Sequence, residues 1–201
     1  RYTIGQGVES DRSEALKWFT LAANQGDAIS QRELGKYYGE QWNLKESNQW
    51  YLKAALQGDV AAQHMMGVRY VFGQGVEVDV QEAGKWFLLA AEQGDAQSQF
   101  SIGQRWVRGE AGEPQDFAEA AKWFSLAAEQ GLDEAQLSLG RRYAEGTGVE
   151  QDYVEAYKWF WLAQNQGKVQ GAAGALTEIE AHMTPQQIAE ARKKATAFVP
   201  Q

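Results

Sequence analysis

Residues 85–95 read KWFLLAAEQGD, and this stretch decides the fold because it returns along the chain with small changes. It recurs as KWFTLAANQGD from Lys17, QWYLKAALQGD from Gln49, KWFSLAAEQG from Lys122 and KWFWLAQNQG from Lys158. Its Trp returns after 32, 36, 37 and 36 residues. A fixed period of this length indicates an array of repeated structural units.

A second motif follows each glycine that closes the first. Counted from Gly94, it places Gln at offset five, an aliphatic residue at eight, Gly at nine and an aromatic residue at twelve. Apolar residues at three- and four-residue intervals predict two helices per unit. A glycine inside a helix costs about 1 kcal/mol relative to alanine. The recurring glycine therefore predicts the close approach of a neighbouring helix, and it stands at Gly35, Gly67, Gly103 and Gly140.

Start and stop signals lie where two helices per unit need them. The second helix of each unit is predicted to begin with a capping box. The side chain of its first residue accepts a hydrogen bond from the backbone of the first turn, and a Glu three residues later accepts one from the backbone N–H of that first residue. The pairs are Asp11/Glu14, Asn43/Glu46, Asp79/Glu82, Asp116/Glu119 and Asp152/Glu155. The closing glycine can adopt the left-handed conformation that ends a helix. Asp27, Asp59 and Asp95 are placed to cap the next first helix, and Gly-x-Gly-Val segments form tight connections, as at 73–76.

The repeated Trp is predicted to be buried in the core. Truncating a buried Trp or Phe to Ala typically costs about 3–5 kcal/mol, which is a large part of the stability of a small protein. The alternative is that these rings stack on a ligand.

This combination of Trp-Phe, Leu-Gly-x-x-Tyr and Gly-x-Gly-Val with a period near 36 resembles the Sel-1-like repeat family, a relative of the tetratricopeptide repeats. The resemblance covers about residues 1–167 and implies an all-α, right-handed superhelical solenoid of antiparallel helix pairs. Two segments depart from the pattern. The 27–58 unit has a shortened linker without Gly-x-Gly-Val, and Ala172 and Leu176 stand where Gln and Gly would be expected.

We expect a single array over residues 1–201. Its parts are a partial repeat at 1–26, repeats at 27–58, 59–94, 95–131 and 132–167, and a C-terminal cap at 168–201. The cap is predicted to hold helices over about 168–182 and 184–198, the second with Thr184 and Gln187 as its capping box and Pro185 at its first position. The cap would shield the last apolar surface of the stack.

At the other end, the first residues match the middle of a unit, so the array is expected to begin mid-repeat. We expect a processed protein or a fragment on this ground. An apolar N-terminal edge around Tyr2, Ile4, Val8 and Phe19 is predicted, and with it self-association through that edge.

The composition excludes several classes of protein. The chain is 44% hydrophobic and has no cysteine, so it has no disulfide framework, thiolate zinc site or cysteine nucleophile. The 19 Lys and Arg against 27 Asp and Glu give a net charge of −8, which disfavours nucleic acid as a partner. No stretch approaches the roughly 18 uninterrupted apolar residues of a membrane span.

The inventory of reactive groups predicts neither an enzyme nor a bound cofactor or metal. His64 and His182 are far apart and have no ligand-spaced histidine partner. The repeated Asp/Glu pairs fit helix caps better than acid–base dyads, and the Gly-x-Gly segments fit turns better than phosphate cradles. The alternative is an enzyme of the β-lactam-binding or hydrolysing kind, which the resemblance implies through cysteine-rich relatives.

The candidate site is the concave groove of the array. By analogy with tetratricopeptide proteins, residues at offsets three, six, ten, thirteen and fourteen from each closing glycine are expected to face this groove. The candidates are Arg32, Lys36, His64, Val68, Phe72, Phe100, Gln104, Arg108, Leu137 and Arg141. An apolar centre flanked by cations predicts a peptide or helix partner with apolar anchors and acidic character, since aromatic and Arg anchors favour interfaces. The alternative is that Phe72 and Phe100 pack against neighbouring helices.

A further series at offset eleven consists of Arg69, Arg105 and Arg142. It is interpreted as a structural ladder that pairs with helix-start carboxylates.

The resemblance implies a non-catalytic protein-interaction scaffold or adaptor. Bacterial members of the family act in signalling, envelope assembly, host interaction or as immunity proteins against effectors. The resemblance also favours a periplasmic or secreted location over the cytoplasm.

Overall fold

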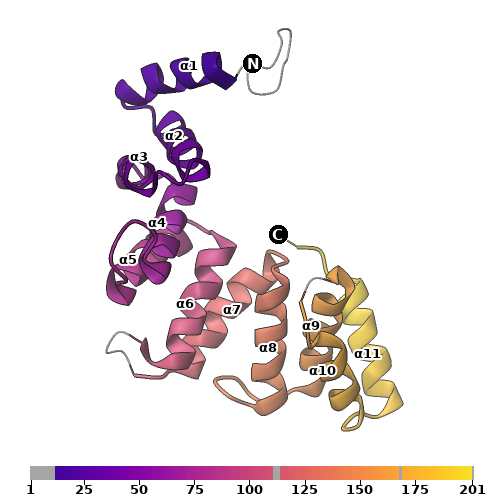
Figure 1. The fold of residues 1–201 in the computed structure, drawn as a ribbon. Helices are drawn as coiled ribbons and strands as arrows, with labels where there is room; N and C mark the ends of the chain where they lie inside the picture. Colours follow the sequence, from indigo (N-terminus) through magenta and orange to yellow (C-terminus); the bar gives the residue numbers. More distant parts are fainter. Residues whose placement is uncertain (1–11, 111–113, 168, 201) are drawn as a thin grey trace. The chain divides into compact units, whose positions relative to one another are not determined.

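A computed structural model of the chain describes residues 12–110, 114–167 and 169–200. Within these ranges it contains eleven helices and no strand. The predicted fold class, an all-α solenoid of antiparallel helix pairs, is confirmed (Figure 1). The chain forms two compact units, Arg1–Gln93 and Gly94–Gln201.

The first unit holds five helices. They are α1 (Arg12–Asn24), α2 (Ala28–Glu40), α3 (Leu44–Leu56), α4 (Val60–Phe72) and α5 (Val80–Glu92). Successive helices pack on one another in chain order, with α2 against α3 and α4 against α5 as the closest pairs. Tyr51, Met66 and Trp86 lie together in the core of this unit with several small alanines.

The second unit holds two further helix pairs and the C-terminal helices. The helices are α6 (Ala96–Arg108), α7 (Phe117–Glu129), α8 (Asp133–Glu145), α9 (Tyr153–Gln166), α10 (Ala172–Glu180) and α11 (Pro185–Thr196). Helix α6 pairs with α7 and α8 with α9, whereas α10 and α11 both pack on α9 (Figure 1). Two clusters of buried side chains form the core, one around Phe124 and Trp159 and the other around Tyr157 and Phe160.

The helix caps agree with the sequence in part. The side chains of Asp27, Asp59 and Asp95 accept backbone bonds at the starts of α2, α4 and α6. Asp79, Asp116 and Asp152 do the same at α5, α7 and α9. The closing glycines take positive φ, for example 96° at Gly26. Asp11/Glu14 cannot be assessed as a box, because Asp11 is outside the described residues.

Two details of the predicted capping boxes are wrong. Asn43 makes no side-chain cap bond at α3. The Glu carboxylates of the boxes at α5, α7 and α9 bind the lysine three residues later, as in the 2.8 Å bond from Lys85 to Glu82. An ammonium group in reach offers the carboxylate a charge-assisted bond, which is stronger than a bond to a neutral backbone N–H.

The mid-helix glycines are explained by the second aromatic residue of the Trp motif. A Cβ added at Gly103 would lie 2.6 Å from the ring of Phe124, and one at Gly67 would lie 2.6 Å from Phe87. Gly140 faces Phe160 and Gly35 faces Tyr51 in the same way. The predicted close approach is therefore an aromatic ring of the paired helix resting on the glycine.

The prediction that every Trp of the motif is buried is wrong. Trp86 and Trp159 are buried, Trp50 and Trp123 are half-buried, and Trp18 is 55% exposed. The residue after the Trp faces the paired helix, so the Trp lies on an adjacent face whose cover depends on the next helix.

The recurring Gln at offset five is buried and joins three helices. Gln31 on α2 donates to the carbonyl of Ala23 at the end of α1 (3.0 Å) and accepts from Gln57 after α3 (2.7 Å). Gln136 on α8 repeats this with Ala128 and Gln166. These bonds satisfy buried polar groups at helix ends, where backbone carbonyls lack helical partners.

The C-terminal helices differ in length from the prediction. Helix α10 begins at Ala172 and ends at Glu180, so it is shorter than the expected helix over 168–182. Leu176 is buried at the position of the repeat glycine. A large side chain fits there because α11 presents Ile188 and Ala191 to the same cluster and carries no aromatic residue. Helix α11 has both halves of its predicted capping box.

Candidate functional site

The ten predicted groove residues divide equally between the two units. Arg32 and Lys36 lie on α2, and His64, Val68 and Phe72 lie on α4. In the second unit, α6 carries Phe100, Gln104 and Arg108, and α8 carries Leu137 and Arg141. The candidate site is therefore described for each unit by itself.

In the first unit, the candidates on α2 and α4 make contacts within the array. Arg32 Nη1 lies 2.9 Å from Oδ2 of Asp59, the residue that caps α4. The ring of His64 lies 5.5 Å from that of Phe87. Phe72 is 68% exposed, which answers the question of its direction: it does not pack into the core.

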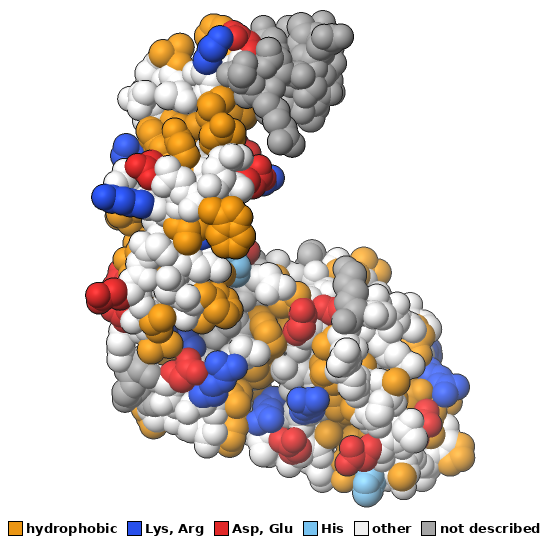
Figure 2. All heavy atoms as spheres, in the orientation of Figure 1, with side chains coloured by type: hydrophobic (Ala, Val, Ile, Leu, Met, Phe, Trp, Pro, Cys, Tyr) orange, Lys and Arg blue, Asp and Glu red, His pale blue; other side chains and the backbone are white. Residues whose placement is uncertain are grey.

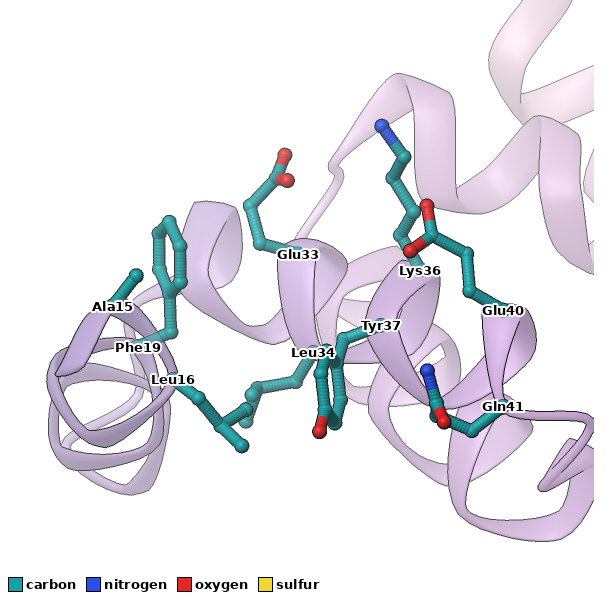
Figure 3. Close-up of a pocket in the computed structure, with 9 residues that line it drawn as sticks. All are labelled: Ala15, Leu16, Phe19, Glu33, Leu34, Lys36, Tyr37, Glu40 and Gln41. Carbon is teal, nitrogen blue, oxygen red and sulfur yellow. The ribbon is translucent and has the colours of Figure 1, made fainter. Parts of the chain in front are cut away.

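A pocket of about 210 Å³ opens between α1 and α2. Figure 3 shows Phe19 and Leu16 of α1 facing Leu34 and Tyr37 of α2 across it. Lys36 is the one predicted groove residue in its lining, and two carboxylates, Glu33 and Glu40, line it as well. Its charge is therefore mixed. Of the predicted N-terminal edge, Phe19 is half-buried here, whereas Tyr2, Ile4 and Val8 lie outside the described residues.

In the second unit, a pocket of about 160 Å³ brings three predicted residues together. Gln104 and Arg108 of α6 and Arg141 of α8 line it. Val107, at offset thirteen, is also predicted to face the groove, whereas Arg142 belongs to the offset-eleven series interpreted as structural. The sequence does not single out the remaining lining residues, Phe124 and Ser138. Helical spacing could have found Ser138, because it lies three residues before Arg141. The described lining contains three arginines and no carboxylate.

The three guanidinium groups differ in how far they are already paired. Arg108 bonds to Glu110 at 3.0 Å and to the side chain of Gln104 at 3.3 Å. Arg142 lies 3.1 Å from Glu145 and stacks on the ring of Phe117, and its Nε is buried without a hydrogen-bond partner among the described residues. Arg141 is exposed and makes no ion pair within the described part of the chain.

Another pocket of the second unit, of about 460 Å³, adjoins the pocket of about 160 Å³ and shares Arg141 with it. It lies between α8, α9 and α10, and its apolar lining includes Tyr153, Phe160 and Ile179. Its charged lining residues are Arg141, Glu145 and Glu178, and His182 also lines it. On the visible face of this unit, Figure 2 shows basic side chains with hydrophobic and acidic side chains beside them.

Two of the predicted apolar anchors pack inside the second unit. Leu137 is only 6% exposed and belongs to the core around Phe160, so it lies inside the array and does not present an open anchor. Phe100 is half-buried, and its ring lies 5.6 Å from that of Phe124. The packing alternative therefore describes Phe100 well, and it does not describe Phe72.

The arginines at offset eleven make contacts within the array. For Arg69 and Arg142, the prediction that they pair with helix-start carboxylates is wrong. Arg69 is buried, and it binds Gln74 at 2.9 Å and the hydroxyl of Ser47 at 3.3 Å. Arg142 pairs with Glu145 near the end of its own helix. Neither partner is a helix-start carboxylate, because both arginines reach toward the ends of the first helices, where they meet the linkers.

Within residues 12–110, 114–167 and 169–200, no group of three or more His, Cys, Asp or Glu side chains is arranged to hold a metal ion. None of the helices described there combines the length and apolar character needed to cross a membrane. The ring of His182 lies 5.5 Å from that of Tyr153.

A family model of the Sel1 repeat matches the chain five times, at residues 1–27, 28–59, 60–95, 96–132 and 133–167. The chain belongs to the Sel1 repeat family. Sel1 repeat proteins are generally scaffolds for protein interactions, and their fold is typical of non-catalytic repeat scaffolds. No curated protein matches the chain.

Solved structures of Sel1 proteins are similar to the chain. A Sel1 repeat protein from Oxalobacter formigenes is 32% identical with a TM-score of 0.77, and the match covers 97% of this chain and 83% of that one. A protective antigen present in uropathogenic Escherichia coli strains, which displays an SLR fold, is 29% identical with a TM-score of 0.62; the match covers 98% of this chain and 50% of that one.

Cysteine rich protein B of Helicobacter pylori shares the fold, at 23% identity and a TM-score of 0.52, with 66% of this chain and 93% of that one covered. All three sources are bacteria, which suggests a bacterial origin for this Sel1 chain.

Proposed function

We propose that this Sel1 array binds a peptide segment of a partner protein along α6 and α8. The observation that carries the proposal is the pair of adjoining pockets that share Arg141. Their combined lining is open and partly apolar, and it includes Gln104, Arg108 and Arg141, which do not recur at the equivalent positions of the other repeats. An elongated surface of this kind suits an extended polypeptide better than a small closed substrate.

The variable positions support this choice of surface. The packing positions keep their identity from repeat to repeat, as with Gly67, Gly103 and Gly140. Offset ten holds Lys36, Val68, Gln104 and Arg141 in successive repeats. Where packing does not determine the residue, its identity is free to serve recognition.

Site-specific crosslinking tests the proposal. A photoreactive amino acid replaces Gln104 in one protein and the exposed Gln186 of α11 in a matched control. We expect a defined partner to crosslink at position 104 and not at 186, in proteins of equal helicity. Crosslinking that is the same at both positions, or absent at 104, contradicts the proposal.

We also propose that the chain associates with itself through α1. Trp18 and Leu21 are more than half exposed on this helix, and Phe19 lines an open pocket. Exposed large apolar side chains close together are typical of interaction surfaces. Sedimentation of the wild type should show a concentration-dependent dimer that the double variant Trp18→Ser/Leu21→Ser loses. A wild type that stays monomeric at all concentrations contradicts this.

The enzyme alternative is less well supported. It rests on cysteine-rich relatives, whereas this chain has no cysteine, and its likeness to the H. pylori protein is one of fold. Hydrolysis of a chromogenic cephalosporin by the purified protein, above the rate of a heat-denatured sample, would favour it. A role in signalling, envelope assembly or effector immunity depends on the partner, which the crosslinking would identify.

A further inference from the structure

We infer that the pocket formed by Arg108, Arg141 and Arg142 receives the side-chain carboxylate of a glutamate or aspartate in the bound peptide. The inference rests on the proposed function and names the chemistry of the residue that the partner inserts. This pocket of about 160 Å³ lies between α6, α7 and α8.

The charge of the lining favours a carboxylate. Three side chains in the lining are cationic, the amide of Gln104 and the hydroxyl of Ser138 can also donate hydrogen bonds, and no carboxylate belongs to the lining. The whole chain carries a net charge of −8. A locally positive pocket on an acidic protein attracts a compact anion. It does not repel the uncharged part of a bound peptide.

The lining also has unused hydrogen-bonding capacity. Arg141 is exposed and makes no ion pair within the described residues. Its guanidinium N–H groups can bond to an incoming acceptor without breaking an ion pair in that part of the chain. A carboxylate is the geometric match, because its two oxygens can meet two N–H groups of one guanidinium fork.

The apolar part of the lining suits the methylenes of a Glu side chain. Val107 and the ring of Phe124 supply apolar surface beside the guanidinium groups. The methylenes of a Glu side chain can lie against this surface while the carboxylate reaches the arginines. Glu110 and Glu145 already bind Arg108 and Arg142 from outside the pocket lining at 3.0 and 3.1 Å. They hold two guanidiniums in place and leave Arg141 with a full positive charge.

The test follows the side-chain Nε–H signals of the arginines by NMR in the full chain. The probes are N-acetyl-glutamate amide, its neutral partner N-acetyl-glutamine amide, acetate and inorganic phosphate. We expect N-acetyl-glutamate amide to shift the Arg141 and Arg142 signals saturably, and to bind at least about threefold more tightly than acetate because its methylenes contact Val107 and Phe124. N-acetyl-glutamine amide should leave the signals unchanged.

Arg141→Gln is the main variant, because Arg141 is exposed and the substitution keeps much of its volume. Lys193→Gln is the matched control, since it removes one charge from an exposed position of α11 in the same unit. We expect Arg141→Gln to weaken binding of N-acetyl-glutamate amide at least about fivefold, and Lys193→Gln to leave it unchanged. Arg108→Gln serves as a second variant if Arg141→Gln loses helicity.

Three outcomes overturn the inference. The first is no saturable shift with N-acetyl-glutamate amide, and the second is that acetate and phosphate bind as tightly as N-acetyl-glutamate amide. The third is that Arg141→Gln and Lys193→Gln weaken its binding equally. These are separable from failure of the proposed function. Crosslinking at position 104 that persists when the glutamate probe does not bind rejects only the carboxylate. Binding of the probe without any specific crosslink rejects the peptide partner and leaves a small-anion pocket.

Discussion

The side-chain amide of Gln93 donates a hydrogen bond of 2.7 Å to the side-chain oxygen of Gln63. The amide of Gln63 in turn donates to the backbone carbonyl of Ala55 at 3.1 Å. A single buried side chain on α4 thus joins the end of α3 to the end of α5. This pair of bonds holds neighbouring repeats in register, because Gln63 can make both bonds only when α3, α4 and α5 keep this arrangement.

Replacing Gln63 by Ala should destabilise the first unit by about 1–3 kcal/mol. The change leaves the buried carbonyl of Ala55 without its side-chain donor, and it removes the acceptor of the exposed Gln93 amide. Urea unfolding followed by circular dichroism measures the effect. The control Gln49→Ala removes an exposed glutamine from α3 and should change stability by less than about 0.5 kcal/mol. Equal effects of the two variants would argue against this role for the pair of bonds.

Gly103→Ala should destabilise the second unit by about 1–3 kcal/mol, despite the better helix propensity of Ala. Its Cβ would lie 2.6 Å from the Phe124 ring, so the helix pair must separate or the ring must move. Gly174→Ala on α10 is the matched control, because nothing lies within 4 Å of a Cβ there. That variant should gain stability, by up to about 1 kcal/mol. A stabilising Gly103→Ala variant in thermal unfolding would contradict the packing argument.

Two tryptophans at equivalent positions should respond differently to truncation. Trp159 is 4% exposed and contacts the ring of Phe198, so Trp159→Ala should cost about 3–5 kcal/mol. Trp18 is largely exposed on α1, and Trp18→Ala should cost less than about 1 kcal/mol. Denaturant unfolding of the two variants compares them directly. A large loss at position 18 would show that this Trp is covered in solution, as self-association through α1 would also predict at high protein concentration.

Tyr51 should make stability sensitive to alkaline pH. Burial raises the pKa of Tyr51, and the nearby Arg69 opposes this in part. As the pH rises past about 10, the unfolded chain loses this proton first, so the contribution of Tyr51 to stability falls until the pH passes its pKa in the folded protein. The loss therefore lies on the alkaline side and is absent at neutral pH.

The variant Tyr51→Phe tests this, because equivalent positions already hold Phe87, Phe124 and Phe160. At pH 7 its free energy of unfolding should lie within about 1 kcal/mol of the wild type. Above pH 10 it should lose less stability than the wild type, although Tyr143, whose pKa burial also raises, remains in both proteins. Parallel stability curves for the two proteins would exclude a role for Tyr51.

The sequence predicts the fold well because the same short-range signals recur in each repeat. The cap at Asp59, the closing Gly58 and the mid-helix Gly67 each act within one or two helices, and equivalent residues return at the same spacing along the chain. The weak points are those where the repeat pattern changes. In the shortened linker, Asn43 does not cap its helix, and Trp42 takes a positive φ of 56° where other repeats have glycines.

The candidate site was less accessible to sequence reasoning. Analogy placed Gln104, Arg108 and Arg141 on groove-facing positions, and the structure brings these three to one pocket. It also placed Leu137 there, although that side chain is buried. Offset counting gives the direction of a Cβ and says nothing of which neighbouring helix covers the side chain.

The sequence by itself determined the helices of the regular repeats, most of their caps, the glycine contacts and the membership of the chain in the Sel1 repeat family, because those features depend on short-range spacing that repeats. Only the tertiary structure decided which aromatic residue of the Trp motif is buried, how the offset-five glutamines link three helices, and that three arginines from two repeats line one hollow. Burial and charge at a surface are set by side chains more than thirty residues apart in the chain. No local pattern records how those side chains meet.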